Sequence, residues 1–210
     1  MNHRFLEKEV VALFLNGTPP KIYCKKKHYY KKIFSVDGAF HYIKKIGVKV
    51  DFFIGDFDSF PKKNLPSFGN NVLEKKNQNQ TDFEKALNII YKKGFFNINV
   101  WGGSGKEQDH FLGNLSTALK YKKKLSIIFH DDYHSYFFSD KKNFFYQKKN
   151  KKISLFPFPE VEGIFTRGLK YPISNGLLKI GEHIGIRNEA CKNKIEISYQ
   201  RGELLIFIEK

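Results

Sequence analysis

The chain has 210 residues, 41% of them hydrophobic and 16% aromatic, a composition that excludes an intrinsically disordered protein and suffices for one large domain or two small ones. Its two cysteines, Cys24 and Cys191, lie far apart, which excludes a disulfide framework or a cysteine zinc site. The apolar run at residues 10–15 is too short to cross a bilayer, and the segment before it, with Glu7 and Glu9, lacks the pattern of a signal peptide. We therefore expect a soluble cytoplasmic protein with no membrane partner.

The formal net charge of +16 raises the question of a nucleic-acid partner. The chain has only four arginines, however, and base recognition relies on the bidentate fork of arginine. We interpret the charge as a solvated, lysine-rich surface that attracts anionic small molecules, with no specific nucleic acid bound. A basic nucleic-acid-binding protein is the alternative.

The N-terminal part alternates strand-like and helix-like segments. Thr81 and Glu84 form a capping-box pattern before a helical apolar period, and residues 110–119 predict a second helix. Short apolar runs predict buried strands at residues 10–15, 33–36, 52–54, 98–101 and 125–129. This alternation predicts a parallel sheet with helices on both faces.

The pattern changes near Asp132. Short β-like runs follow, separated by lysine-rich or Gly/Pro/Asn turns, at residues 144–146, 153–156, 163–166, 177–180, 195–199 and 204–208. Such runs are typical of an antiparallel β-sandwich. We therefore expect a nucleotide-binding α/β domain over residues 1–132 and a C-terminal β-sandwich domain over residues 133–210.

Acidic residues collect where the predicted strands of the first domain end. Asp37, Asp56 and Asp58 follow strands, Asp82 opens a helix, and Asp109 follows a glycine-rich turn. The carboxyl ends of strands in an open α/β sheet form the crevice that binds ligands. Carboxylates gathered there repel one another unless a cation neutralises them, and Mg²⁺ combines carboxylates with phosphate oxygens. The sequence therefore predicts nucleotide phosphate chemistry.

Asp56 and Asp58 belong to the sharpest local motif, Gly55-Asp56-Phe57-Asp58-Ser59. Two aspartates at this spacing can bind one metal where the backbone turns, and Gly55 permits the turn. Taken alone, the motif fits an Asx turn without a metal equally well.

Two further motifs carry less information. The backbone amides of the glycine-rich residues 102–106 can bind a phosphate, and Lys106 can add positive charge. The spacing of these residues is not that of a Walker A loop, and a tight turn without a ligand is the alternative. His130 and His134 would converge on a metal only on a helix, and they flank a predicted strand end instead. We expect these histidines to be structural or exposed.

Taken together and in order, these segments resemble the thiamine pyrophosphokinase family. Each match alone is weak, but the ordered set is specific and spans nearly the whole chain. The matching segments are residues 16–17, 37–39, 55–59, 78–82, 109–114 and 168–171.

The resemblance implies a homodimer that uses ATP and Mg²⁺ and holds thiamine between the α/β domain of one subunit and the β domain of its partner. Residue patterns and resemblance give the metal ligands as Asp37, Asp56 and Asp58, and the catalytic carboxylates as Asp56, Asp82 and Asp109. Nucleotide contacts are expected from Asn16, Gly17, Asp37, Gly38, Ser59, Thr81, Gly105, Lys106 and His110. Thiamine contacts are expected from Gln78, Arg187 and Asn188.

The chain departs from the family pattern at two positions. Glu107 stands where the family has an arginine, and the adjacent Lys106 can supply a phosphate contact without the bidentate fork. Arg187 stands where the family has a serine that lines the thiamine pocket. Since a guanidinium beside the thiazolium cation is unfavourable, we expect Arg187 to point to solvent or to pair with Glu189.

The expected reaction is attack of the thiamine hydroxyl on the β-phosphorus of ATP, with AMP leaving. Asp82 or Asp109 accepts the hydroxyl proton, and the sequence does not choose between them. The alternatives are an ATP-dependent kinase of another small alcohol and the nucleic-acid-binding protein. The ordered aspartates favour an enzyme, because carboxylates in a groove repel a phosphate backbone.

Overall fold

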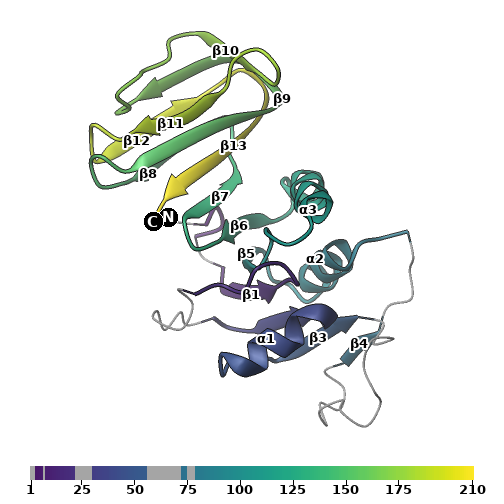
Figure 1. Ribbon diagram of the computed structural model, residues 1–210. Coiled ribbons are helices and arrows are strands. Elements are labelled where there is room, and N and C mark those ends of the chain that lie inside the picture. The colour runs from purple at the N-terminus through teal and green to yellow at the C-terminus, as the bar shows by residue number, and fades with distance from the viewer. Residues whose placement is uncertain (1–2, 7, 22–29, 56–71, 75–78) are drawn as a thin grey trace. The chain divides into compact units, whose positions relative to one another are not determined.

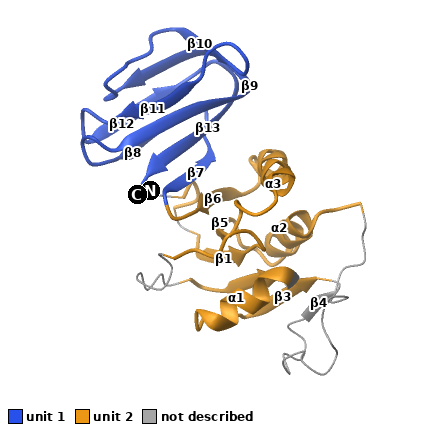
Figure 2. Cartoon of the chain, in the orientation of Figure 1, with its two compact units in different colours: residues 1–2, 133–210 blue, residues 3–132 orange. Residues whose placement is uncertain are grey.

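The computed structural model describes residues 3–6, 8–21, 30–55, 72–74 and 79–210, and Figure 1 shows the course of the chain. The chain forms two compact units, His3–Asp132 and Tyr133–Lys210. They are orange and blue in Figure 2 and are called the N-terminal and the C-terminal unit below. No helix in the described part of the chain is long and apolar enough to cross a membrane.

The N-terminal unit contains a parallel sheet. Its strands lie in the order β4-β3-β2-β1-β5-β6, and each neighbouring pair is parallel. The strands are β1 (Val10–Phe14), β2 (Ile33–Val36), β3 (Phe52–Gly55), β4 (Val72–Glu74), β5 (Asn97–Trp101) and β6 (Ser126–His130). The order reverses between β1 and β5, because β2 follows β1 on one side while β5 and β6 add on the other. Such a reversal creates a crevice at the carboxyl ends of the two strands.

Burial explains the central place of β1. Four consecutive side chains, from Val11 to Phe14, are fully buried, so both faces of this strand must be covered.

The helices are α1 (Phe40–Lys45), preceded by a short 3-10 turn at Asp37–Ala39, α2 (Asp82–Lys92) and α3 (Gln108–Tyr121). Helix α2 packs against α3, β2 and β3 (Figure 1). Its buried Phe83, Leu87 and Ile90 recur at helical spacing.

The capping pattern before α2 is present in part. Thr81 Oγ1 accepts a hydrogen bond from the Glu84 backbone N–H at 3.2 Å, which satisfies one of the free donors of the first turn. The Glu84 carboxylate accepts hydrogen bonds from the Gln80 side chain (3.2 Å) and from Lys120 (2.6 Å). Glu84 therefore ties the start of α2 to α3.

The C-terminal unit is built from antiparallel pairs. Its strands lie in the order β7-β13-β9-β12-β8, and β10 and β11 both pair with β9. They are β7 (His134–Phe138), β8 (Lys142–Tyr146), β9 (Lys152–Arg167), β10 (Gly176–Lys179), β11 (Gly185–Glu189), β12 (Lys194–Ser198) and β13 (Arg201–Glu209). Fully buried Ile153, Leu155, Val161, Leu204 and Ile206 belong to a core of this unit's own.

One expectation for this unit is wrong. Residues 153–156 and 163–166 are parts of one 16-residue strand, β9, although Pro157 and Pro159 suggested a break. Proline lacks a donor for the strand ladder and is tolerated where the ladder is irregular. The pairing of β9 with β13 shifts register between Gly202 and Leu204, and Leu204 is the partner of Pro157. The extra residues of this irregularity lie in β9, between Pro157 and Val161, so the ladder is interrupted next to the prolines and the strand continues beyond them.

Candidate active site

The loops that follow β1 and β5 are joined to each other at the reversal of strand order. The backbone N–H groups of Leu15, Gly17 and Thr18 donate to the carbonyl oxygens of Trp101, Gly102 and Ser104, each at 2.8 Å. Tyr42 in α1 donates its hydroxyl hydrogen to the Leu15 carbonyl oxygen at 2.8 Å. The two loops thus form one continuous floor at the carboxyl ends of the central strands.

Two glycines allow the close approach of these loops. A Cβ at position 17 would lie 2.3 Å from the carbonyl oxygens of Gly102 and Ser104, and a Cβ at position 38 would lie 2.3 Å from the Asn16 side-chain nitrogen. Only glycine fits both positions without a shift of the neighbouring atoms. The absence of these side chains lets the ends of β1, β2 and β5 converge.

A cavity of about 460 Å³ opens above this floor. The residues that line it come from the loops after β1 and β5, from the end of β2, and from the starts of α2 and α3. Nine of the residues expected from the sequence line it together: Asn16, Gly17, Gly38, Thr81, Asp82, Gly105, Lys106, Asp109 and His110. Because both helices begin at this cavity, their free N–H groups and positive dipole ends favour an anionic ligand there.

Asp82 is held by a buried lysine. Lys85 Nζ lies 3.1 Å from Asp82 Oδ1, three residues earlier on α2. The Lys85 side chain is 7% exposed, whereas the Asp82 side chain is 51% exposed and lines the cavity. A buried ammonium needs a charged or polar partner, so the pair fixes the orientation of the Asp82 carboxylate.

Asp109 and its neighbours lie at the first turn of α3. Asp109 Oδ1 accepts a hydrogen bond from the His110 backbone N–H at 2.9 Å. His110 Nε2 lies 3.9 Å from a carboxylate oxygen of Glu107, and all three side chains line the cavity. Asp82, Glu107 and Asp109 therefore make this wall of the cavity acidic.

Several further residues line the cavity, although the sequence analysis assigned them no ligand contact. Asn114 on α3 donates a side-chain hydrogen bond to the Gly103 carbonyl oxygen at 3.0 Å, which fixes the loop after β5 against the helix. Gln80, Glu107 and Phe111 also line the cavity. A signal for Asn114 exists, because it lies four residues after His110 and so on the same helix face.

Part of the expected site lies outside the described residues. This holds for Asp56, Asp58, Ser59 and Gln78, and for the side chain of Asp37. Within the described part of the chain, no three His, Cys, Asp or Glu side chains form a cluster that could hold a metal ion. His130 has a structural environment, since its Nε2 lies 3.0 Å from Asn99 Oδ1 and its ring stacks on Trp101.

Arg187 and Asn188 lie on β11 in the C-terminal unit. Asn188 accepts hydrogen bonds from the backbone N–H groups of Tyr171 (3.1 Å) and Glu189 (2.8 Å), and donates one to the Tyr171 carbonyl oxygen (2.7 Å). This buried amide therefore fixes the backbone at Tyr171. The Arg187 side chain is exposed, and the Glu189 carboxylate pairs with Lys152.

The backbone of Arg187 is unusual. Its φ of +56° lies in the left-handed region, which is uncommon for a residue with a side chain. The register between β11 and β9 shifts between Gly185 and Asn188, and the Arg187 N–H donates to Ser154 Oγ at 2.9 Å instead of continuing the ladder. Arg187 is thus the bulge residue of β11.

Comparison with known proteins gives a consistent result. Residues 25–129 match the catalytic domain of thiamin pyrophosphokinase, and residues 142–204 match its vitamin B1 binding domain. A curated thiamine pyrophosphokinase of Bacillus subtilis (strain 168) is 28% identical over 163 residues, which are 72% of this chain and 75% of the relative. The crystal structure of thiamine pyrophosphokinase from Bacillus subtilis has a TM-score of 0.82 at 23% identity and covers 96% of this chain and 99% of its own. The thiamin pyrophosphokinase from Candida albicans has a TM-score of 0.83 at 16% identity, covering 99% and 90%.

Proposed function

This chain belongs to the thiamin pyrophosphokinase family, and we propose that it transfers pyrophosphate from ATP to the hydroxyl of thiamine, with the cavity of the N-terminal unit as its ATP site. The observation that carries this proposal is the convergence of nine expected residues on one cavity at the reversal of strand order. Independent patterns in the sequence and the ligand-binding position of the α/β fold thus indicate the same place.

The phosphate chain of ATP is held by the floor and by the helix starts. The glycine-rich loop after β5 offers backbone N–H groups, and α2 and α3 both direct their N-termini at the cavity. Since these donors are fixed by the fold before ATP binds, they stabilise charge on the transferring group without reorganising.

We propose that a magnesium ion compensates the negative charge of the cavity. Its acidic residues, Asp82, Glu107 and Asp109, outnumber its one described lysine or arginine, Lys106, so a polyanionic ligand meets excess negative charge. Oxygen ligands of this kind are those that Mg²⁺ prefers. We assign the ion to Asp37, Asp56 and Asp58, with Asp82 or Asp109 beside them. When bound, Mg²⁺ neutralises charge on the phosphate oxygens.

The chain's own residues handle the proton and the alignment. The thiamine hydroxyl oxygen forms a bond to the β-phosphorus, the bond from this phosphorus to the α-phosphate oxygen breaks, and AMP leaves with the electron pair. Asp82 or Asp109 accepts the hydroxyl proton. Lys85 keeps the Asp82 carboxylate oriented towards the cavity throughout.

We assign thiamine recognition to the C-terminal unit, as a β-sandwich domain, with Arg187 and Asn188 near the site and Gln78 contributing from the N-terminal unit. The match of residues 142–204 to a vitamin B1 binding domain supports this assignment. The homodimer and the cytoplasmic location belong to the same proposal.

The test is a product assay that separates AMP from ADP. With ATP, Mg²⁺ and thiamine we expect one AMP for each thiamine pyrophosphate, and almost no AMP without thiamine. Release of ADP instead would identify a kinase that transfers a single phosphoryl group. The absence of any thiamine-dependent nucleotide product would reject the proposed function.

A further inference from the structure

Lys106 differs in charge from the acidic residues that line the cavity with it. Among the described lining residues it is the one lysine or arginine, and it shares the cavity with the acidic Asp82, Glu107 and Asp109. A polyanionic ligand entering this cavity therefore meets Lys106 as the one lysine or arginine of the described lining, since Lys85 is buried and paired with Asp82. The direction of this one side chain has a large effect on phosphate binding.

The backbone at Lys106 is held in an unfavourable conformation. Its φ is +57°, in the left-handed region, and it lies between Gly105 and the N-cap of α3 at Glu107. Such a conformation costs free energy for any residue with a Cβ and persists only where the surrounding structure fixes it. Strain of this kind at a site-lining residue points to a functional requirement for the direction of its side chain.

Asn16 fixes that direction. Lys106 Nζ donates a hydrogen bond to Asn16 Oδ1 at 2.9 Å, across the two joined loops. On its other side the Asn16 amide packs against Gly38, where a Cβ would come within 2.3 Å of its nitrogen. Both partners of the hydrogen bond are exposed, so the bond adds little to folding stability and is readily exchanged for a stronger acceptor.

We infer that Lys106 recognises the phosphate chain of ATP and that Asn16 is a positioning residue that holds the Lys106 ammonium at the phosphate end of the cavity. The inference rests on the proposed function, because it takes ATP as the ligand. A charged phosphate oxygen is a stronger acceptor for an ammonium than the neutral amide oxygen of Asn16. Asn16 therefore holds the Lys106 ammonium in place before ATP binds. When ATP binds, the ammonium exchanges its hydrogen bond to Asn16 for one to a phosphate oxygen.

The neutral amide at position 16 matters for this transfer. An aspartate there would hold Lys106 as an ion pair and would also repel the phosphates. Asn16→Asp should therefore weaken ATP binding more than Asn16→Ala, although aspartate keeps an oxygen in reach of Lys106. A purely structural role for Asn16 would give the opposite order.

The experiment measures the affinities of ATP and adenosine by calorimetric titration in the presence of Mg²⁺. Lys106→Gly removes the charge while suiting the left-handed backbone, and its fold is checked by thermal unfolding. We expect it to weaken ATP binding about 10- to 100-fold and adenosine binding by less than about threefold. Lys106→Arg should keep ATP affinity within about tenfold of wild type, because it retains the charge.

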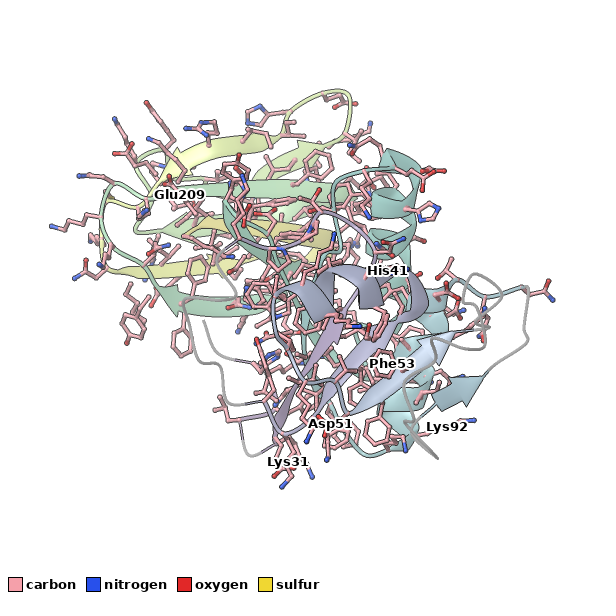
Figure 3. The ribbon with its side chains drawn as sticks, turned by 60° about the horizontal axis from the view of Figure 1, so that its bottom comes forward. Lys31, His41, Asp51, Phe53, Lys92 and Glu209 are labelled. Carbon is pink, nitrogen blue, oxygen red and sulfur yellow. The ribbon has the colours of Figure 1, made fainter. Side chains whose placement is uncertain are left out.

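Lys92→Ala is the matched control. It removes the same charge from the exposed last position of α2, the end opposite to Asp82, and Lys92 (labelled in Figure 3) is not among the residues that line the cavity, so both affinities should stay unchanged. Steady-state kinetics add a second readout, since Lys106→Gly should raise the KM for ATP more than the KM for thiamine.

The possible results distinguish the role of Lys106 from the proposed function. Wild-type affinity of Lys106→Gly for ATP overturns the inference and leaves the proposed function in place. Equal losses for ATP and adenosine overturn it as well, because they indicate distortion of the loop. Failure of the wild-type protein to bind ATP overturns both the inference and the proposed function.

Discussion

Polar groups at the amino ends of the parallel strands in the N-terminal unit are paired with one another, whereas those at the carboxyl ends line an open cavity. At the amino ends, Asp51 accepts hydrogen bonds from the Ile33 backbone N–H (2.8 Å) and from Lys32 (3.0 Å), and Glu9 pairs with Lys31 at 2.8 Å. Figure 3 labels Lys31 and Asp51 in this region. Each of these carboxylates has a lysine of its own.

The N-terminal segment completes the amino ends of β5 and β6. The Asn97 side chain donates to the Phe5 and Lys8 carbonyl oxygens at 2.6 and 2.9 Å, and Arg4 donates to the Leu125 carbonyl oxygen at 2.7 Å. The carbonyl oxygens of Phe5, Lys8 and Leu125 thereby receive hydrogen bonds within the protein.

The carboxyl ends are left open and acidic. The described lining carries the carboxylates of Asp82, Glu107 and Asp109 with Lys106 as its one described lysine or arginine, in a chain whose formal net charge is +16. The N-terminal unit therefore uses the two ends of its strands for separate purposes, stability at the amino ends and ligand binding at the carboxyl ends. Substitutions at the two ends should therefore be separable by their effects.

The sharpest test of this separation compares two Asp→Asn substitutions. Asp82→Asn should lower kcat/KM by at least about 100-fold, because it removes a carboxylate at the reacting end. Its effect on stability should be below about 1 kcal/mol, because asparagine keeps an amide oxygen as acceptor for the buried Lys85 and the side chain is half-exposed. Asp51→Asn should destabilise by about 1–2 kcal/mol through its lost hydrogen bonds and keep kcat/KM within about threefold. Urea unfolding and the AMP assay measure both quantities, and equal losses of activity would refute the separation.

A smaller effect is expected at Lys85. Lys85→Met preserves the buried volume but removes the partner that orients Asp82, so kcat should fall about tenfold while the KM for ATP changes less. Lys92→Met on the same helix is the control and should behave like wild type. If Lys85→Met has full activity, Asp82 needs no fixed orientation and the role given to the pair is wrong.

The amino ends should respond to pH without a matching loss of catalysis. Burial lowers the pKa of His3 from 6.5 to about 4, although the hydrogen bonds that its ring makes with Asn99 and Ser126 act in the opposite direction. Because the unfolded chain binds the proton more readily, the stability that His3 provides is complete above about pH 6.5 and is lost as pH falls towards 4. Between pH 7 and pH 4.5, wild type should lose about 1–2 kcal/mol more than His3→Gln. Identical pH profiles for the two proteins in urea unfolding would contradict this expectation.

The smallest effect is expected at Arg187, which belongs to neither end. Arg187→Gly should stabilise the protein by about 0.5–1 kcal/mol, because glycine adopts the left-handed backbone without strain. Arg187→Ala removes the same side chain without relieving the strain and should give no such gain. Because the side chain is exposed, the thiamine KM of Arg187→Ser should stay within about tenfold of wild type. A larger change in either direction would place Arg187 in the thiamine site.

The sequence predicts those parts of the fold that depend on local patterns. The central strand at residues 10–14 is a continuous apolar run, and α2 combines a cap at Thr81 with helical apolar spacing. Strand β11 was not predicted, because its residues, Gly185–Glu189, do not alternate and a bulge interrupts their pairing. The single strand β9 was hidden by its prolines, which are accommodated where the pairing of β9 with β13 is irregular.

The candidate site also contains residues that local sequence patterns reveal and contacts that they do not. Its acidic residues and glycines are visible as motifs at the ends of predicted strands, and most of those that the structure describes line one cavity. The hydrogen bond between Asn16 and Lys106 spans 90 residues of sequence and depends on the packing of two loops, which no local pattern encodes. For Asn114 the sequence shows the helical spacing from His110 but not the hydrogen bond to the Gly103 carbonyl oxygen.

The joined loops also affect the thermodynamics of binding. The hydrogen bonds from Gly17 to Gly102 and from Thr18 to Ser104 order both loops during folding, when each residue loses about 1–2 kcal/mol of conformational entropy. A nucleotide therefore meets a floor that is already ordered, and its binding does not carry that entropic cost. In Gly17→Ala the methyl group would clash with two carbonyl oxygens and should separate the loops. The loops would then lose their conformational entropy when the nucleotide binds, and not during folding. Its nucleotide affinity should then fall through a less favourable entropy of binding.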